Sequence, residues 1–206
     1  MAAERPVVFV IDDDPLMRHA VEDLVASVGL ETRVFATPQE FLQAKRTDAP
    51  SCLVLDVRLP GVSGLAFQEE LARTGVPLPV IFITGHGDIP MSVRAIKAGA
   101  VEFLCKPFRD QELLDAIHAG IERDRVQRQA TATVGEIKRR FAALTDRERE
   151  IMAQVIQGHA NKRIAGELGV AEATVKVHRG QIMRKMAARS LPELVRMGDL
   201  LGKPKS

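Results

Sequence analysis

The sequence contains no tryptophan and no tyrosine, and only two cysteines occur among its 206 residues. Cys52 and Cys105 lie far apart, and neither belongs to a metal-ligand motif. A disulfide framework or a zinc site is therefore not expected, and two reduced structural thiols are the favoured interpretation. Because Cys105 stands beside a lysine, a redox-sensing thiol is the alternative at that position.

Long hydrophobic runs are also missing. The longest apolar stretches, Val7–Ile11 and residues 79–84, are much shorter than the stretch of about 18 to 20 residues that spans a bilayer. The first residues lack the basic region, apolar stretch and cleavage site of a signal peptide. We therefore expect a cytoplasmic protein without a membrane partner.

The composition is that of a folded protein, with 46% hydrophobic and 27% charged residues. Because 206 residues exceed the usual domain size of about 100 to 150, two domains are favoured. Residues 1–122 carry 18 acidic and 11 basic side chains, a net charge of −7, whereas residues 123–206 carry 9 and 18, a net charge of +9. The basic half predicts a polyanionic partner. Since Phe141 is the last aromatic residue, duplex DNA is favoured over unpaired bases, which proteins bind by stacking.

Short apolar runs alternate with stretches of helical spacing in the acidic half. Three of these runs show no polar alternation, which indicates strands buried on both faces of a parallel sheet. The pattern predicts a five-stranded, doubly wound α/β domain. The expected strands are residues 7–11, 32–35, 52–55, 80–84 and 101–105, and the expected helices are residues 15–28, 37–46, 64–74, 89–98 and a fifth after Asp110.

Polar side chains stand at the carboxyl ends of the predicted strands. Asp12 and Asp13 follow the first strand, Asp56 follows the third, Thr84 ends the fourth and Lys106 follows the fifth. These ends form one edge of a parallel sheet, so the side chains are expected to converge. Clustered carboxylates either raise a pKa or bind a hard cation such as Mg²⁺ through oxygen ligands.

These segments resemble the receiver domain of two-component response regulators, over residues 6 to about 122. The likeness rests on the runs VVFVIDDD (7–14), LVLDVRLPG (53–61), FITGHG (82–87) and GAVEFLCKPF (99–108). It implies a flavodoxin-like fold in which a sensor histidine kinase phosphorylates Asp56. The implied Mg²⁺ ligands are Asp12, Asp13, Asp56 and the Arg58 backbone carbonyl. The side chains implied to contact the phosphoryl oxygens are those of Thr84 and Lys106.

The resemblance also implies a switch. A phosphoryl group adds a charge of about −1.5 to −2 to the aspartate and would draw Thr84 and Lys106 inward. Phe103 is similar to the switching aromatic of the family and would fill the space that Thr84 leaves, although a permanently buried core phenylalanine is the alternative. The remodelled face, residues about 89 to 120, is the expected surface of a phosphorylation-dependent homodimer.

Other residues near this site carry weaker signals. Arg58 and His86 stand two residues after Asp56 and Thr84, and we hypothesise that they tune hydrolysis of the acyl phosphate. Ordinary surface residues are an equally favoured interpretation. A cis bond between Lys106 and Pro107 is compatible with a bend that aims the lysine into the site.

The polar and small residues after Arg123 have no apolar face, which predicts a linker over residues 123–137, helical in its first part. Residues 138–206 predict an all-α domain, a bundle of four helices. Thr145 with Glu148 forms a capping box, and Ser190 with Glu193 repeats the pattern before the last helix. Between them, Asn161 is expected to cap a short helix ending at Leu168, and another helix begins near Glu172.

The middle two of these helices have helix-turn-helix spacing. If Val175 and Ile182 face inward, His178 shares their side. Helical geometry then places a set of residues on the outer stripe, namely Glu172, Lys176, Arg179 and Met183. Lys176 and Arg179 are therefore the expected groove-facing cations.

Residues 142 to about 201 resemble the LuxR-type DNA-binding domain, through LTDRERE (144–150), NKRIA (161–165) and TVKVHR (174–179). Ala171 stands where the family often has a capping serine, at a cost to the recognition helix of about 1 kcal/mol. The resemblance assigns base or backbone contacts to Thr174, Lys176, Val177 and Arg179, and phosphate contacts to Asn161 and Lys162.

The two halves together look like the FixJ/NarL class of transcriptional regulators. The expected function is phosphorylation of Asp56 that promotes dimerisation and sequence-specific binding of duplex DNA. Dimerisation would place two recognition helices about one DNA turn, roughly 34 Å, apart. RNA polymerase is a further expected partner, and no turnover enzyme is expected beyond autodephosphorylation. Two alternatives stay open: a magnesium-dependent phosphatase or phosphotransferase, and a constitutive DNA binder with a purely structural first domain.

Overall fold

The computed structural model describes residues 5–45, 48–75, 78–85 and 87–202. The chain divides into two compact units, Met1–Arg128 and Gln129–Ser206. Each unit buries its own apolar side chains. None of the helices in the described ranges is both long and apolar enough to cross a membrane.

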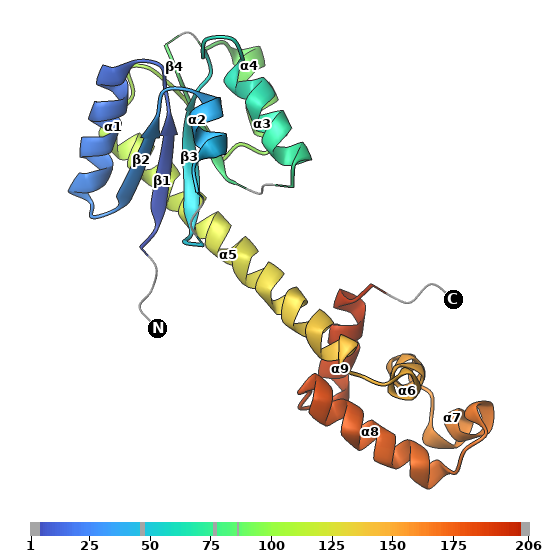
Figure 1. The fold of residues 1–206 in the computed structure, drawn as a ribbon. Helices are drawn as coiled ribbons and strands as arrows, with labels where there is room; N and C mark the ends of the chain where they lie inside the picture. Colours follow the sequence, from blue (N-terminus) through green and yellow to red (C-terminus); the bar gives the residue numbers. More distant parts are fainter. Residues whose placement is uncertain (1–4, 46–47, 76–77, 86, 203–206) are drawn as a thin grey trace. The chain divides into compact units, whose positions relative to one another are not determined.

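The first unit is built on a parallel sheet (Figure 1). Its strands lie in the order β2-β1-β3-β4-β5. Every residue of β1, β3 and β4 is buried, as the absence of polar alternation predicts. The predicted doubly wound fold is confirmed, with strands at β1 (Val7–Ile11), β2 (Glu31–Phe35), β3 (Ser51–Asp56), β4 (Val80–Thr84) and β5 (Glu102–Cys105).

Helices cover both faces of this sheet (Figure 1). On one face, α1 (Pro15–Ser27) and α5 (Asp110–Ala142) pack against strand residues such as Val10 and Ile83. The other face carries a cluster of phenylalanine rings, in which Phe41 meets Phe9 edge to face at 5.4 Å. The helices that cover it are α2 (Pro38–Gln43), α3 (Gly64–Arg73) and α4 (Ile89–Lys97).

Helix α5 extends through the whole of the predicted linker, residues 123–137, and not only through its first part. Near the start of this segment lies Asp124, which is 2% exposed. Its Oδ2 accepts hydrogen bonds from the Ser51 backbone N–H at 2.8 Å and from Arg128 Nε at 2.6 Å. Arg128 also donates to the Asp48 carbonyl at 2.9 Å. These bonds hold α5 against the start of β3, so the compact first unit continues beyond residue 122 to Arg128.

The second unit is all-helical, as predicted. The last turns of α5 contribute Ile137 and Phe141 to its core. The four helices that follow are α6 (Asp146–Ile156), α7 (Asn161–Leu168), α8 (Glu172–Met186) and α9 (Leu191–Leu200). Val175 and Ile182 are buried in this core, which confirms the predicted inner side of α8.

Helix starts in the second unit follow the capping prediction at two places. The Thr145–Glu148 capping box is present before α6, and Ser190 caps α9. The prediction for Asn161 is wrong, because Ala160 occupies the N-cap and Asn161 is already the first residue of α7. In the described structure neither Ala160 nor Ala171, the N-cap of α8, provides a side-chain hydrogen bond.

Candidate functional site

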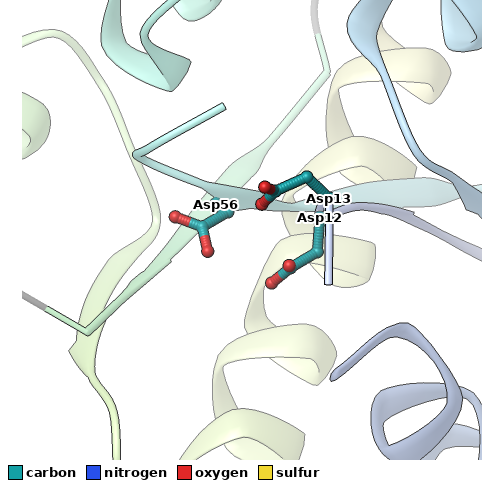
Figure 2. A group of neighbouring side chains, drawn as sticks. All are labelled: Asp12, Asp13 and Asp56. Atoms are coloured by element: carbon teal, nitrogen blue, oxygen red, sulfur yellow. The ribbon is translucent and has the colours of Figure 1, made fainter. Parts of the chain in front are cut away.

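Three carboxylates converge at the carboxyl edge of the sheet. Strands β1 and β3 are neighbours whose register aligns Ile11 with Leu55, so Asp12 and Asp56 stand at adjacent strand ends. One oxygen from each of Asp12, Asp13 and Asp56 lies within 4.8 Å of the others. Figure 2 shows the three side chains grouped at this edge. The sequence-based prediction that these strand ends meet is confirmed.

Lys106 lies between two of these carboxylates. Its Nζ donates to Asp12 Oδ2 at 2.8 Å and to Asp56 Oδ2 at 2.7 Å. Asp12 is 0% exposed and Asp56 is 7% exposed. The Lys106–Pro107 peptide bond is cis, in agreement with the bend considered from the sequence.

The electrostatics favour further positive charge in the site. Burial raises the pKa of Asp12 above its ordinary value, although the hydrogen bond from Lys106 opposes the shift. Burial lowers the pKa of Lys106, but its hydrogen bonds to Asp12 and Asp56 outweigh that effect and leave the pKa raised. The lysine therefore stays charged. One ammonium cannot neutralise three carboxylates, so the donor set suits a hard divalent cation with oxygen ligands.

Backbone hydrogen bonds orient the two buried carboxylates. The Asp14 N–H donates to Asp12 Oδ1 at 2.9 Å, and the Arg58 N–H donates to Asp56 Oδ1 at 2.8 Å. Arg58 itself is exposed. His86, the second predicted rim residue, lies outside the described residues.

Two supporting residues escaped the sequence analysis. Arg18, on α1, donates through Nη1 to the backbone carbonyls of Asp12 at 2.7 Å and Asp13 at 3.1 Å. Gly64 starts α3 beside the end of β3, and a Cβ there would overlap the Asp56 carbonyl oxygen. Neither residue stands at a strand end, where the sequence analysis searched. The glycine at position 64, a few residues after Asp56, is the one signal that could have indicated the close approach of α3 to the Asp56 carbonyl.

Thr84 and Phe103 lie next to each other beside this site. Thr84 is 0% exposed, and its carbonyl accepts from the Lys106 N–H at 2.7 Å. Phe103 is half-buried, with its ring 6.3 Å from that of Phe82. A Cβ at Gly87 would meet Phe103 Cε1, Cys105 Sγ and Thr84 Cγ2. The glycine therefore lets the aromatic ring and the threonine pack closely.

The two cysteines differ in environment. Cys52 is buried, and burial raises the pKa of its thiol to about 12, as an inert structural thiol requires. Cys105 is exposed, so the interpretation as a structural thiol, which requires burial in the core, is wrong there. The reason is that β5 is an edge strand whose pattern leaves this residue uncovered.

The residues predicted to contact DNA lie on α7 and α8. Thr174, Lys176 and Val177 are exposed, and Val177 is 60% exposed despite its apolar side chain. Lys162 is exposed at the start of α7. Arg179 and Asn161 are half-buried and hydrogen-bonded to each other, with Arg179 Nη1 donating to Asn161 Oδ1 at 2.7 Å. Arg179 also lines a cavity with Ile182 and Leu194, so it is less outward than the predicted groove-facing position.

Two further residues of α8 test the predicted faces. His178 is half-buried, which agrees with its predicted inner side. The outward position of Met183 is wrong, because this side chain packs against the core and lines a cavity of about 140 Å³ with Leu191 and Leu194. Helix α8 packs against both α6 and α7, and Met183 also faces Leu191 and Leu194 of α9, so the exposed stripe of α8 is narrower than one inward pair suggests.

Two family models match this chain. Residues 8–118 match the response regulator receiver domain, and residues 142–198 match the bacterial regulatory proteins of the luxR family. The chain therefore belongs to the response regulators and combines a receiver domain with a LuxR-type DNA-binding domain.

Particular relatives are similar over nearly the whole chain. The chain is 56% identical to nodulation protein W of Bradyrhizobium diazoefficiens, over 98% of this chain and 88% of that protein. It is 43% identical to the transcriptional regulatory protein FixJ of Azorhizobium caulinodans, over 95% of this chain and 92% of that protein.

Solved structures agree. The response regulator StyR matches with a TM-score of 0.84 and 48% identity, over 95% of this chain and 98% of that chain. Full-length FixJ from B. japonicum matches with a TM-score of 0.57 and 37% identity, over 99% of this chain and 100% of that chain. The predicted family is thus confirmed, and the chain is a transcriptional response regulator rather than a typical enzyme.

Proposed function

We propose that Asp56 is the residue that a sensor histidine kinase phosphorylates, and that this modification controls DNA binding by the second domain. The observation that carries the proposal is the pair of hydrogen bonds by which Lys106 bridges Asp12 and Asp56. Asp56 is held at one oxygen by this lysine and at the other by the Arg58 N–H. A carboxylate fixed at both oxygens is positioned for in-line attack.

The chemistry is transfer of a phosphoryl group between two residues. An Asp56 oxygen attacks phosphorus, the bond from phosphorus to the histidine nitrogen of the kinase breaks, and an acyl phosphate forms. Lys106 then pairs with a phosphoryl oxygen, and the Thr84 hydroxyl donates to another. Autodephosphorylation, in which water attacks the same acyl phosphate, returns the aspartate.

Asp12, Asp13, Asp56 and the Arg58 backbone carbonyl would hold Mg²⁺. When bound, Mg²⁺ neutralises charge on both the nucleophile and the phosphoryl group, which otherwise repel each other. Support for this assignment comes from the grouping of the three carboxylates, only two of which are paired with Lys106.

Phe103 would report the modification. Its position supports this role, because the Phe103 ring and the Thr84 side chain both border the space beside Gly87, so a shift of Thr84 would change the space available to the ring. The face of residues about 89 to 120 would then form a homodimer. Exposed apolar side chains on α4 support this surface, since Ile89 is 80% and Ile96 is 47% exposed.

Duplex DNA would be bound by the helix-turn-helix. We assign base or backbone contacts to Thr174, Lys176, Val177 and Arg179, and phosphate contacts to Asn161 and Lys162. The uncapped starts of α7 and α8 support phosphate binding, because their first N–H groups have no side-chain acceptor in the described structure.

The proposed organisation follows from these roles. Residues 1–122 would form the phosphoacceptor domain and residues 138–206 the DNA-binding domain, joined by a helical linker over residues 123–137 whose first part, up to Arg128, packs with the first unit. RNA polymerase would be the further partner of a DNA-bound dimer. As a regulator of bacterial genes, the protein would act in the cytoplasm, where the chromosome lies.

The Asp56→Asn variant of the full chain tests this function. Wild type should take up one phosphoryl group per chain from acetyl phosphate and then bind duplex DNA more tightly, and the variant should do neither. Its DNA binding without phosphodonor should equal that of unphosphorylated wild type. Full phosphodonor-dependent binding by the variant would refute the role of Asp56, and continuous turnover of a phosphomonoester by wild type would favour a phosphatase.

A further inference from the structure

We propose that Asn161 is a positioning residue that holds Arg179 in the orientation needed to read a base, so that α7 contributes to sequence selectivity through a side chain that touches no base. The inference rests on the proposed function of the helix-turn-helix. It begins from one hydrogen bond, in which Arg179 Nη1 donates to Asn161 Oδ1 at 2.7 Å. This bond joins the first residue of α7 to the middle of α8.

Asn161 has its acceptor turned to the neighbouring helix and not to its own backbone. An asparagine at a helix start usually accepts a bond from the backbone N–H groups of the first turn. Here Ala160 occupies the N-cap, so Asn161 lies one position too late for that role. Its Oδ1 is used by Arg179, while its amide Nδ2 keeps two donors that can bind a phosphate oxygen.

Arg179 gains orientation without losing its ability to recognise a base. A guanidinium carries five N–H donors in one plane, and a bidentate contact with the O6 and N7 atoms of guanine uses two of them. One donor bound to Asn161 restricts the rotation of the plane and leaves enough donors for the base. The long side chain is half-buried beside Ile182 and Leu194, which further limits its freedom.

Lys176 provides the contrast within the same helix. It is exposed, and in the described part of the chain no hydrogen bond or ion pair fixes its ammonium. A flexible point charge of this kind attracts phosphates but discriminates poorly between bases. Selectivity is therefore expected to depend on the tethered arginine more than on the free lysine.

Because the side chain of Asn161 is uncharged, the salt dependence of DNA binding can distinguish its positioning role from phosphate binding by a cation. In a plot of the logarithm of affinity against the logarithm of salt concentration, removing a cation that neutralises one phosphate makes the slope shallower by about 0.9. Replacing Asn161 removes no charge, so the salt dependence should not change. Lys162, the exposed cation beside it, is a matched control whose loss should change it.

The test uses full-length protein with acetyl phosphate and two duplexes of equal length. One duplex is the sequence that wild type selects from a random pool, and the other is unrelated. Asn161→Ala should weaken binding to the selected duplex by about tenfold, with binding to the unrelated duplex changed much less. The double variant with Arg179→Ala should bind the selected duplex no more weakly than Arg179→Ala alone, because the tether then has nothing to hold.

Two further variants complete the design. Lys162→Ala should weaken both duplexes to the same extent, reduce the salt dependence and act additively with Arg179→Ala. Asn161→Asp keeps an acceptor for Arg179 and adds a negative charge near the phosphates. It should therefore retain the sequence preference of wild type while lowering affinity for both duplexes, which distinguishes positioning of Arg179 from a general effect on α7.

Specific results would overturn the tether. Additive effects of Asn161→Ala and Arg179→Ala, or equal losses on both duplexes, would show that the asparagine only binds phosphate. Tighter selective binding by Asn161→Ala would show that the bond restrains Arg179 from the groove. If wild type itself selected no sequence from the pool, the proposed DNA-binding function would fail, and this result is distinct from a selective wild type that is unaffected by Asn161→Ala.

Discussion

The two units of the molecule place the side chains proposed to be functional in opposite ways. In the first, Asp12, Asp56 and Lys106 come from three strands, and both carboxylates are almost fully buried. In the second, Thr174 and Lys176 are near neighbours on one helix, and both are exposed. Phosphoryl transfer needs charges fixed in a shielded site, whereas a base-reading surface must reach into a groove. The first arrangement is made by tertiary folding and the second mainly by one helix.

Helix starts show the same contrast. Six helices begin with a residue whose side chain caps the backbone, namely Asp14, Thr37, Ser63, Asp88, Thr145 and Ser190. In the described structure, the N-caps of α7 and α8 are alanines without such a bond. These two helices are the ones proposed to meet DNA. Local stability is therefore lower where a phosphate could supply the missing acceptor.

The largest expected effect is on phosphorylation of the receiver. Asp13→Asn should slow phosphorylation by acetyl phosphate about a hundredfold, because it removes one carboxylate of the proposed Mg²⁺ site. Chelation of Mg²⁺ should have a similar effect on wild type. Phosphoryl incorporation measured over time checks both.

Asp14→Asn is the matched control for that prediction. Asp14 caps α1, and asparagine caps about as well as aspartate. This variant keeps the backbone N–H that binds Asp12 and should be phosphorylated at nearly the wild-type rate. Equal rates for wild type and Asp13→Asn would remove Asp13 from the site.

The next effect concerns the buried contact at the other end of the sheet. Asp124→Ala leaves the buried Ser51 N–H without its acceptor and should lower the free energy of unfolding of the first unit by about 1 to 3 kcal/mol. Hydrogen exchange of amides in β1 and β3 measures this stability.

Glu122→Ala is the comparison for Asp124. Glu122 pairs with Arg125 on the exposed side of the same helix, and such pairs contribute about 0 to 1 kcal/mol. Equal loss of stability in the two variants would contradict the view that the first unit depends on its buried polar contacts.

A smaller effect is expected from the buried carboxylate of the second unit. Hydrogen bonds from Lys185 and from the Thr145 backbone N–H lower the pKa of Glu148, which is 2% exposed. A carboxylate whose pKa is lower in the folded state than in the unfolded state stabilises the unit at pH values above the unfolded-state pKa of about 4.3. This stabilisation is lost as the pH falls through the folded-state pKa.

Unfolding of the second unit at pH values from neutral down to about 3.5 tests this expectation. Glu148→Gln should flatten the decrease in stability at acid pH. Glu150→Gln changes a half-exposed residue of the same helix and should leave the decrease in place. An unchanged acid dependence in Glu148→Gln would rule out this carboxylate as its source.

The smallest effect concerns the uncapped recognition helix. Ala171→Ser should raise the free energy of unfolding of the second unit by about 0.5 to 1 kcal/mol, and Ser190→Ala should lower it by about 1 kcal/mol. If the free N–H groups of α8 serve DNA phosphates, the more stable Ala171→Ser variant should bind DNA no more tightly than wild type. Tighter binding would contradict the contrast between capped and uncapped helices.

Local patterns predicted much of this molecule. The apolar runs located β1, β3 and β4, and the strand ends located Asp12, Asp56 and Lys106, because parallel strands bring their carboxyl ends to one edge. The capping box before α6 was predicted for the same kind of reason, since its two residues are three positions apart and bind each other's backbone.

The errors concern burial and side-chain partners. Asp124 belongs to a polar segment without an apolar face, yet β3 supplies the N–H that it binds. Met183 was placed outside because α8 was assumed to pack on one side only. Asn161 was assigned to its own helix, whereas Arg179, 18 positions later, is its partner. In each case the deciding contact comes from a remote part of the chain.

The family, the order of elements and the residues available at the strand ends can be read from the amino-acid order alone, because they depend on local periodicity and on motifs of adjacent residues. The pairing of charges, the burial of polar groups and the uncapped helix starts emerge only on folding. Those properties depend on what packs beside each residue, and a single lysine can bridge Asp12 and Asp56 only after three strands have aligned their ends.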